Sequence, residues 1–115
     1  MRRGDIVWVD LEPARGAEAN KRRPAVIVSN EGANQTAQRL GRGVLTVVPV
    51  TSNTSRIHPF QVLLPADRCQ LAQDAKAQAE QIRSIAAERI GAVIGQLPAD
   101  LIEALDDAMR LHLSL

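Results

Sequence analysis

Apolar runs between polar segments predict five short strands along the chain. Residues 5–11 alternate between apolar and polar side chains and are rich in β-branched residues, which is typical of a strand. Residues 90–97 contain two glycines and several β-branched residues, which favours a strand over a helix. The other predicted strands are the mostly apolar runs at residues 24–29, 44–50 and 60–65.

Two prolines and one ambiguous segment refine this pattern. Pro24 fits the first position of a strand, where no ladder donor is needed. Pro49 predicts that residues 44–50 form an edge strand or contain a bulge. Residues 74–85 leave two alternatives open, because their composition favours a helix while their alternating alanines allow strands.

The last segment, residues 98–115, has the clearest helical pattern. Asp100 and Glu103 fall in its first turn, where the helix dipole favours acidic residues. Residues 30–43 are polar and end in a glycine-rich turn, so a short helix or an irregular segment is expected there. The positions of the terminal helix that recur at helical spacing are Leu101, Ile102, Leu105, Met109 and His112.

These elements predict one domain, residues 1–115, that is mainly β with a C-terminal α-helix. The length fits a single domain. Several short strands followed by one terminal helix predict a small β-barrel, or a strongly bent sheet, capped by the helix. Trp8 and Phe60 are the only aromatic residues, and both are expected in a core built mainly from Val, Ile, Leu and Ala.

Cysteine usage and hydropathy bear on the cellular location. Cys69 is the only cysteine, which excludes an intrachain disulfide and suits a reducing compartment. The N-terminal residues reach Asp5 before any apolar run, unlike a signal peptide. No apolar run approaches the roughly 20 residues that cross a bilayer. We therefore expect a cytoplasmic protein with no membrane partner.

The charges are unevenly distributed, although the formal net charge is only +1. Residues 1–43 carry eight Lys or Arg against five acidic residues, whereas residues 91–115 carry one Arg against four acidic residues. An anionic ligand would therefore prefer the first half of the chain. Solvated surface charge is the alternative explanation of the same pattern.

Two polar loops beside predicted strands contain the candidate chemistry. Residues 16–23 place Glu18, Asn20 and three consecutive cations before a buried strand, and residues 51–55 (TSNTS) follow another. Arginine presents a planar fork of donors that suits phosphate, and Ser and Thr hydroxyls also donate to phosphate oxygens. Together these groups would bind a phosphodiester and stabilise the added charge of a pentacoordinate transition state.

Simpler structural explanations of the same residues remain open. Arg23 would also serve as a surface cation at a sheet edge, and Glu18 would pair with a neighbouring Arg for about 0–1 kcal/mol. Residues 51–53 also favour an Asx- or ST-type turn. No metal or cofactor is expected, because no His, Cys or Asp cluster has ligand spacing and no glycine loop of the phosphate-binding type precedes a helix.

Four motifs in order resemble the MazF/PemK/Kid family of bacterial toxin endoribonucleases. Each motif is weak alone, but their order and spacing over nearly the whole chain make the resemblance specific. The motifs are R-G-D-I at residues 3–6, R-P-A-V-I at 23–27, T-S-N at 51–53 and E-Q-I-R at 80–83.

The resemblance implies a fold, an activity and a set of partners. The implied fold is an SH3-like β-barrel with a C-terminal helix, acting as a homodimer. The implied activity is metal-independent cleavage of single-stranded RNA at a short recognition sequence, in which the 2′-OH attacks the adjacent phosphorus. The products would be a 2′,3′-cyclic phosphate and a 5′-hydroxyl. The implied biology is growth arrest, held off by a cognate antitoxin whose disordered tail folds into the RNA groove.

The resemblance also implies roles for individual residues. The family's catalytic Arg before the conserved Pro corresponds to Arg23, and the family's Thr at the end of the strand that precedes the T-S-N turn corresponds to Thr51. These two are the expected catalytic residues. The residues expected to contact RNA are Glu18, Asn20, Lys21, Arg22, Ser52, Asn53 and Gln81.

Proton transfer is the least defined part of this expectation. Arginine stays protonated in proteins, so Arg23 is expected to stabilise charge, and proton donation to the leaving 5′-oxygen is a further option. The base is not evident from the sequence. His58 is a candidate, since a histidine has a suitable ordinary pKa and this one lies on the loop of residues 51–59. His112 is expected to pack on the helix face instead.

Two alternatives share the predicted fold but not the chemistry. Toxins of the CcdB type bind DNA gyrase without cutting RNA, but their function rests on C-terminal hydrophobic and Trp residues. This chain has no Trp after Trp8. The second alternative is a catalytically silent SH3-like interaction module. Such modules dock ligands on aromatic-lined grooves, for which two aromatic residues are too few.

Overall fold

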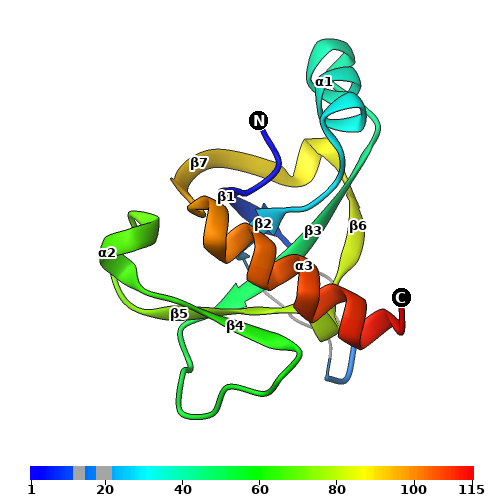
Figure 1. The fold of residues 1–115 in the computed structure, drawn as a ribbon. Coiled ribbons are helices and arrows are strands. Elements are labelled where there is room, and N and C mark those ends of the chain that lie inside the picture. Colours follow the sequence, from blue (N-terminus) through cyan, green and yellow to red (C-terminus); the bar gives the residue numbers. More distant parts are fainter. Residues whose placement is uncertain (12–14, 18–21) are drawn as a thin grey trace.

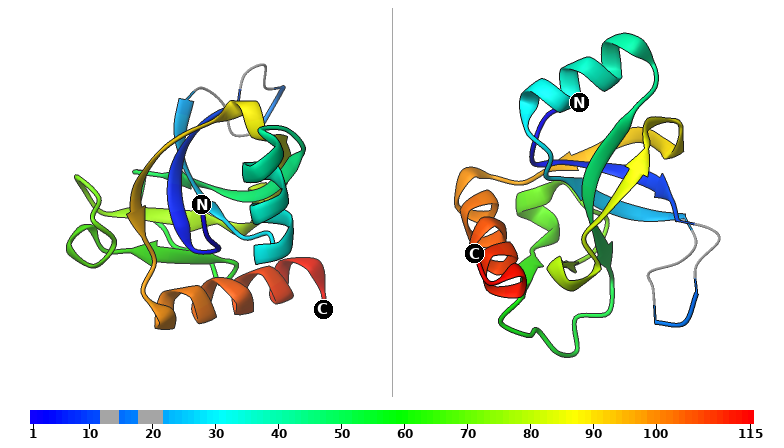
Figure 2. Two further views of the ribbon diagram at one scale, coloured as in Figure 1. Left: turned by 90° about the horizontal axis from the view of Figure 1, so that it is seen from above. Right: turned by 90° about the vertical axis from the view of Figure 1, so that its right-hand side faces the viewer.

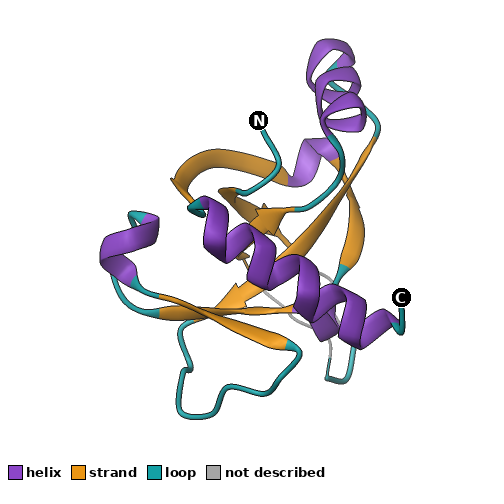
Figure 3. Cartoon of the chain, in the orientation of Figure 1, coloured by secondary structure: helices purple, strands orange, loops and turns teal. Residues whose placement is uncertain are grey.

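The computed structural model describes residues 1–11, 15–17 and 22–115, and this part of the chain is mainly β with a C-terminal helix, as predicted (Figures 1 and 3). The strands are β1 (Asp5–Asp10), β2 (Arg22–Ile27), β3 (Val44–Thr51), β4 (Gln61–Leu64), β5 (Ala75–Gln78), β6 (Arg83–Ala86) and β7 (Ile90–Gln96). The helices are α1 (Glu31–Leu40), α2 (Ala66–Cys69) and α3 (Ala99–Leu113), with single 3₁₀ turns η1 (Ala79–Gln81) and η2 (Ala87–Arg89).

All seven strands belong to one sheet, in the order β4-β5-β3-β2-β1-β7, with β6 beside β3. Strand β3 is central, because it pairs with β2 on one side and with β6 and then β5 on the other. The sheet is strongly curved (Figure 2). Within the described residues no pairing joins the end strands β4 and β7. The sheet is therefore open, and the expected closed barrel is not confirmed.

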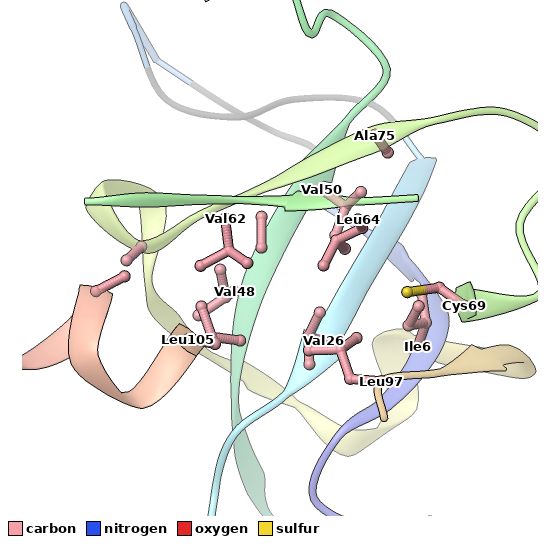
Figure 4. Packing of buried hydrophobic residues seen from close by; sticks show 13 residues of the cluster. Ile6, Val26, Val48, Val50, Val62, Leu64, Cys69, Ala75, Leu97 and Leu105 are labelled. Carbon is pink, nitrogen blue, oxygen red and sulfur yellow. The ribbon is translucent and has the colours of Figure 1, made fainter. Parts of the chain in front are cut away.

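The sheet buries apolar side chains on both faces, because successive strand residues point to opposite sides. Ile6 and Val26 belong to the larger cluster, which also contains Leu105 of α3 (Figure 4). Val7 and Ile27 belong to the cluster on the other face. Fully burying a side chain of this kind stabilises the fold by about 1.5–3 kcal/mol. Both faces thus fix the positions of β1, β2 and β3.

Helix α3 covers one face of the sheet and keeps the predicted periodicity, with Leu105 and Ala108 buried. Its first turn is held by Arg68, whose guanidinium donates to both carboxylate oxygens of Asp100 at 2.7 and 3.0 Å. These bonds lower the pKa of the Asp100 carboxyl. His112 is exposed, so its predicted packing is limited to a ring contact with Phe60 at 6.3 Å.

Residues 31–40 form the helix that was one of two alternatives for this segment. The Asn30 side chain accepts the Ala33 N–H at 2.8 Å, which caps the first turn. Asn34 is buried and its amide donates to the Ser29 carbonyl at 2.9 Å. Gly41 ends the helix at a φ of 65°, a left-handed conformation that favours glycine.

Three strand predictions are corrected or decided by the structure. Strand β2 begins at Arg22, so Arg22 and Arg23 belong to the strand and not to the preceding loop. Strand β3 is central despite Pro49, which lies between the residues paired with β6 and those paired with β5. No β5 or β6 residue is paired with Pro49, so its missing N–H is tolerated there. Residues 74–85 take the strand alternative, as β5 and β6.

The two aromatic residues are not in the core, contrary to the prediction. Trp8 is only partly buried, and the Arg22 guanidinium lies over its ring. Phe60 is also partly buried, and its ring stacks on that of His58 with centroids 5.1 Å apart. Aliphatic side chains and Cys69 fill the described core instead. The chain therefore keeps its largest planar side chains near the surface.

The short helix α2, which no sequence pattern predicted, packs against β7 by a close backbone approach. A Cβ atom at Gly95 of β7 would overlap the carbonyl oxygen of Cys69 at the end of α2. Only glycine leaves room for this contact. The contact also positions the residues that follow α2, and these form one wall of the cavity described below.

Cys69 is expected to be unreactive in the folded protein. Its side chain is buried, and burial raises the pKa of the thiol, so little thiolate is present near neutral pH. An aromatic disulfide reagent at pH 8 should therefore label the native protein far more slowly than protein unfolded in guanidinium chloride. Equal rates in the two states would contradict the packing of α2 against β7.

Candidate functional site

A cavity of about 350 Å³ lies where β2 and β3 meet the segment that follows α2. Two arginines line it, and none of its described lining residues carries a carboxylate. Its electrostatic potential therefore favours an anion. The residues that line it include Trp8 of β1, Arg22 and Arg23 of β2, Thr51 and Ser52 at the end of β3, and Leu71–Gln73 after α2.

Strand pairing brings Arg23 and Thr51 to this cavity from distant parts of the sequence. In the β2–β3 pair, Ala25 lies opposite Pro49. Arg23 precedes Ala25 by two residues and Thr51 follows Pro49 by two residues, so both lie just beyond the last paired positions at the same end of the two strands, and both line the cavity. A guanidinium and a hydroxyl in this arrangement can contact the same phosphate group.

The T-S-N segment forms the hydrogen-bonded turn that was its alternative explanation. The Thr51 hydroxyl oxygen accepts the Asn53 N–H at 3.3 Å. The Asn53 side-chain carbonyl accepts the N–H and the hydroxyl of Ser55 at 3.2 and 2.8 Å. A hydroxyl that accepts a hydrogen bond retains its own proton as a donor. The turn thus fixes Thr51 without using the proton that a ligand oxygen would need.

Arg22 is held at the rim of the cavity by Trp8. The guanidinium carbon lies 5.7 Å from the centre of the Trp8 ring, within the range of a cation–π contact. The two side chains share one face of the β1–β2 pair, because Trp8 lies opposite Pro24 and Asp10 lies opposite Arg22. The contact gives one of the two cations a defined place beside the cavity.

The remaining predicted residues divide into three groups. Ser52 lines the cavity with Thr51, whereas Asn53 and Gln81 do not belong to its walls. Gln81 donates to the Ala17 carbonyl at 3.0 Å, which ties η1 to the first loop. The predicted contacts Glu18, Asn20 and Lys21 lie outside the described residues.

His58, the candidate for proton transfer, is not brought to the site. It does not line the cavity, and its ring stacks on Phe60. Its backbone N–H donates to the Gln61 side chain at 3.0 Å, which fixes the end of the loop against β4. The geometry therefore gives His58 a structural place in the loop, away from Arg23 and Thr51.

Lys76 is a residue that the sequence analysis missed. Its side chain is buried, and its ammonium donates to the Arg56 carbonyl at 2.7 Å. Lys76 also lies opposite Thr51 in the β3–β5 pair. It thereby ties the loop after Thr51 to the strand that neighbours it. The sequence signal for Lys76 was its alternation with alanines. That pattern assigns Lys76 to one face of a strand only if residues 74–85 form strands, which was one of the two alternatives.

The described residues contain no group of three or more His, Cys, Asp and Glu side chains that could hold a metal ion. None of the helices in this part of the chain is long and apolar enough to cross a membrane. The chemistry that the described cavity itself offers is anion binding by guanidinium and hydroxyl groups.

Comparison with known families agrees with this geometry. A family described as "PemK-like, MazF-like toxin of type II toxin-antitoxin system" matches residues 2–113. The chain belongs to this family. The MazF-like chain is 63% identical to endoribonuclease MazF9 of Mycobacterium tuberculosis over 115 residues, which are 100% of this chain and 98% of that protein. It is 32% identical to endoribonuclease MazF6 of M. tuberculosis over 114 residues, 98% and 96% of the two chains.

Solved structures share the MazF-like fold. MazF from Deinococcus radiodurans superposes with a TM-score of 0.82 at 26% identity, covering 100% of this chain and 97% of that one. An endoribonuclease from a mycobacterial species, solved in complex with its cognate antitoxin, superposes with a TM-score of 0.77 at 22% identity over 100% and 96% of the two chains. The family assignment favours the endoribonuclease prediction over the gyrase-binding and silent-module alternatives.

Replacing Thr51 by valine should lower the rate of the RNA cleavage proposed below, but by a smaller factor than replacing Arg23 does. Valine keeps the shape and removes the hydroxyl, which is worth roughly tenfold if one neutral hydrogen bond is lost. Single-turnover cleavage of a labelled RNA measures the effect, and thermal unfolding checks the fold. Thr51→Ser is the matched control and should stay near the wild-type rate. An unchanged rate for Thr51→Val would reduce Thr51 to a turn residue.

Proposed function

We propose that this MazF-like toxin is an endoribonuclease that cleaves single-stranded RNA at a short recognition sequence without a metal ion. The observation that carries the proposal is the shared cavity of Arg23 and Thr51, which is lined by two arginines and by a threonine whose hydroxyl is fixed by the turn. The identity of 63% to a named endoribonuclease over the whole chain supports it.

In the proposed reaction the ribose 2′-oxygen attacks the adjacent phosphorus and the bond to the 5′-oxygen breaks. The products are a 2′,3′-cyclic phosphate and a 5′-hydroxyl. Arg23 stabilises the extra negative charge of the pentacoordinate transition state, and Thr51 donates to a second phosphoryl oxygen. Arg23 keeps its proton throughout. The 2′-proton passes to solvent water and the leaving 5′-oxygen takes a proton from solvent water, since neither transfer is assigned to a described side chain; His58 is left out because it does not line the cavity.

The RNA on either side of the scissile phosphate would meet the other predicted residues. Ser52 and Arg22 line the cavity beside the catalytic pair. Asn53 lies on the turn that follows β3, and Gln81 lies in η1, which follows β5. Contacts from Glu18, Asn20 and Lys21 on the first loop are part of the same proposal and rest on the resemblance alone.

The proposal extends to protein partners and location. An acidic, disordered antitoxin tail would compete with RNA for the arginine-lined cavity, since both are anionic.

A homodimer is supported by exposed apolar side chains that a partner copy would cover. A cytoplasmic location fits an RNA substrate. We also propose that residues 1–115 are one toxin domain whose curved, open sheet is an incompletely closed version of an SH3-like barrel. The exposed large apolar residues of the described chain that support the homodimer include Leu63 of β4, Leu111 and Leu113 at the end of α3, and Leu115.

The test is cleavage of a long RNA without secondary structure, in excess EDTA, with the chemistry of the fragment ends determined. We expect cuts at one short sequence, with 2′,3′-cyclic phosphate and 5′-hydroxyl ends. Pre-incubation with the cognate antitoxin should prevent the cuts. Ends with a 5′-phosphate, or activity only after a divalent cation is added, would reject the proposed chemistry.

A further inference from the structure

A second cavity, of about 660 Å³, adjoins the first across the Trp8–Arg22 contact. Trp8 and Arg22 line both cavities, so their stacked side chains form a shared wall. The first cavity has no acidic lining among the described residues, whereas this second cavity is lined by both acidic and basic groups. In addition to Trp8 and Arg22, the cavity is lined by three charged residues, Asp10, Glu88 and Arg89, and by Gly91.

The shared wall suits a planar ligand. Unpaired RNA bases stack on aromatic rings and on guanidinium planes, and this wall contains one of each, 5.7 Å from ring centre to guanidinium carbon. The first strand, β1, supplies Trp8, and its partner β2 supplies Arg22, so strand pairing fixes both. A base that stacks on Arg22 would extend the contact that Trp8 already makes.

The other side of the cavity offers acceptors and donors at its edge. Glu88 and Asp10 carry carboxylates, which accept hydrogen bonds, and Arg89 carries donors. Arg89 is held across the cavity by its bond to the Asp10 carbonyl at 3.2 Å. Glu88 is exposed and lies in η2, next to Arg89. This set of groups matches the edge of a base better than a phosphate, which the carboxylates would repel.

The backbone of β7 forms a close floor for the cavity. A Cβ atom at Gly91 would lie 3.4 Å from the Arg22 guanidinium and 3.4 Å from the Trp8 Cβ. A methyl group would just fit there, and a larger side chain would take the space beside the stack. Glycine at this position therefore keeps the cavity open.

We propose that this second cavity binds one unpaired base next to the scissile phosphate and selects bases with an exocyclic amino group. The inference rests on the proposed function. The base stacks on Arg22, the Glu88 carboxylate accepts a hydrogen bond from the amino group, and Arg89 donates to the neighbouring acceptor of the base. Cytosine, adenine and guanine satisfy this arrangement. Uracil has no amino group: held with its ring in the position of cytosine, it turns its O4 carbonyl oxygen toward the Glu88 carboxylate, and its ring must shift to bring N3–H there instead.

The test is a binding selection with randomised single-stranded decamers that are 2′-O-methylated and therefore cannot undergo attack by the 2′-oxygen. Wild-type protein should disfavour uracil at one position by about tenfold. Binding of the selected decamers should also change the fluorescence of Trp8, the only tryptophan. Decamers with uracil at that position should need about tenfold higher concentration for the same signal.

Two variants and one matched control make the selection specific. Glu88→Gln should lose the discrimination at that position alone, because an amide can donate to the uracil carbonyl as well as accept. Gly91→Leu should weaken binding of the selected decamers about tenfold, because its side chain occupies the cavity. Glu103→Gln removes a carboxylate from an exposed position of α3 and should keep the wild-type selection.

The outcomes separate this proposal from the proposed function. If no position disfavours uracil, or if Glu88→Gln selects like wild type, the base-binding cavity is rejected even when unmodified RNA is cleaved. If the selection is found and Glu88→Gln removes it, the base site stands even when the same protein cleaves no unmodified RNA. The absence of cleavage, together with an intact selection, would reject only the ribonuclease proposal.

Discussion

Replacing Arg23 by alanine should lower the rate of RNA cleavage by about 10²–10³-fold while the protein stays folded. Arg23 lines the cavity together with Thr51, at the start of β2 before the strand enters the core. Its guanidinium is the group best placed to stabilise charge on the phosphoryl oxygens. Single-turnover cleavage of an end-labelled RNA gives the rate, and circular dichroism with thermal unfolding gives the fold.

The lysine variant and a distant arginine sharpen this prediction. Arg23→Lys should fall between wild type and alanine, because an ammonium keeps the charge but lacks the planar fork of donors. Arg42→Ala removes the same charge from an exposed turn away from the cavity and should cleave like wild type. A folded Arg23→Ala variant with the wild-type rate would remove Arg23 from the catalytic pair.

The largest expected effect on stability is at Gly95. Alanine there would place a Cβ atom on top of the Cys69 carbonyl oxygen, and neither backbone can yield without moving β7 or α2. We expect Gly95→Ala to lower the free energy of unfolding by about 3 kcal/mol or more and the melting temperature by more than about 10 °C. Thermal and chemical unfolding followed by circular dichroism measure both quantities.

Gly91 provides the matched control on the same strand. Its nearest neighbours lie 3.4 Å from a built Cβ, so Gly91→Ala makes the same chemical change without a collision. We expect its melting temperature to stay within a few degrees of wild type. If Gly95→Ala and Gly91→Ala unfold at the same temperature, the close packing of α2 against β7 is wrong.

Much of the fold could be predicted because its periodicity is simple. The strand predicted within residues 5–11 and the helix predicted within residues 98–115 are both confirmed, although β1 is buried on both faces and does not show one-sided alternation. The position of Pro49 in a central strand could not be predicted, since it depends on where two other strands pair with β3. Helix α2 depends in turn on a backbone contact between Gly95 and Cys69, which no local pattern encodes.

The candidate site divides in the same way. Arg23 and Thr51 were paired through motif resemblance, and the β2–β3 register supplies a physical reason for their proximity. The placement of Trp8 at the cavity wall was not predicted, because its alternation within β1 is equally typical of a core residue. His58 was included because histidine is a common proton-transfer residue, but its ring stacks on Phe60 and it does not line the cavity.

The most direct test of the account changes only the proposed nucleophile in the RNA. Once the cut position is mapped, an oligonucleotide with a single 2′-deoxy nucleotide at that position is compared with the all-ribose oligonucleotide, under single-turnover conditions in EDTA. The account predicts that the deoxy oligonucleotide binds with similar affinity, competes with the all-ribose substrate and is not cut at that bond. Cleavage of the deoxy oligonucleotide at the same bond would contradict attack by the 2′-oxygen.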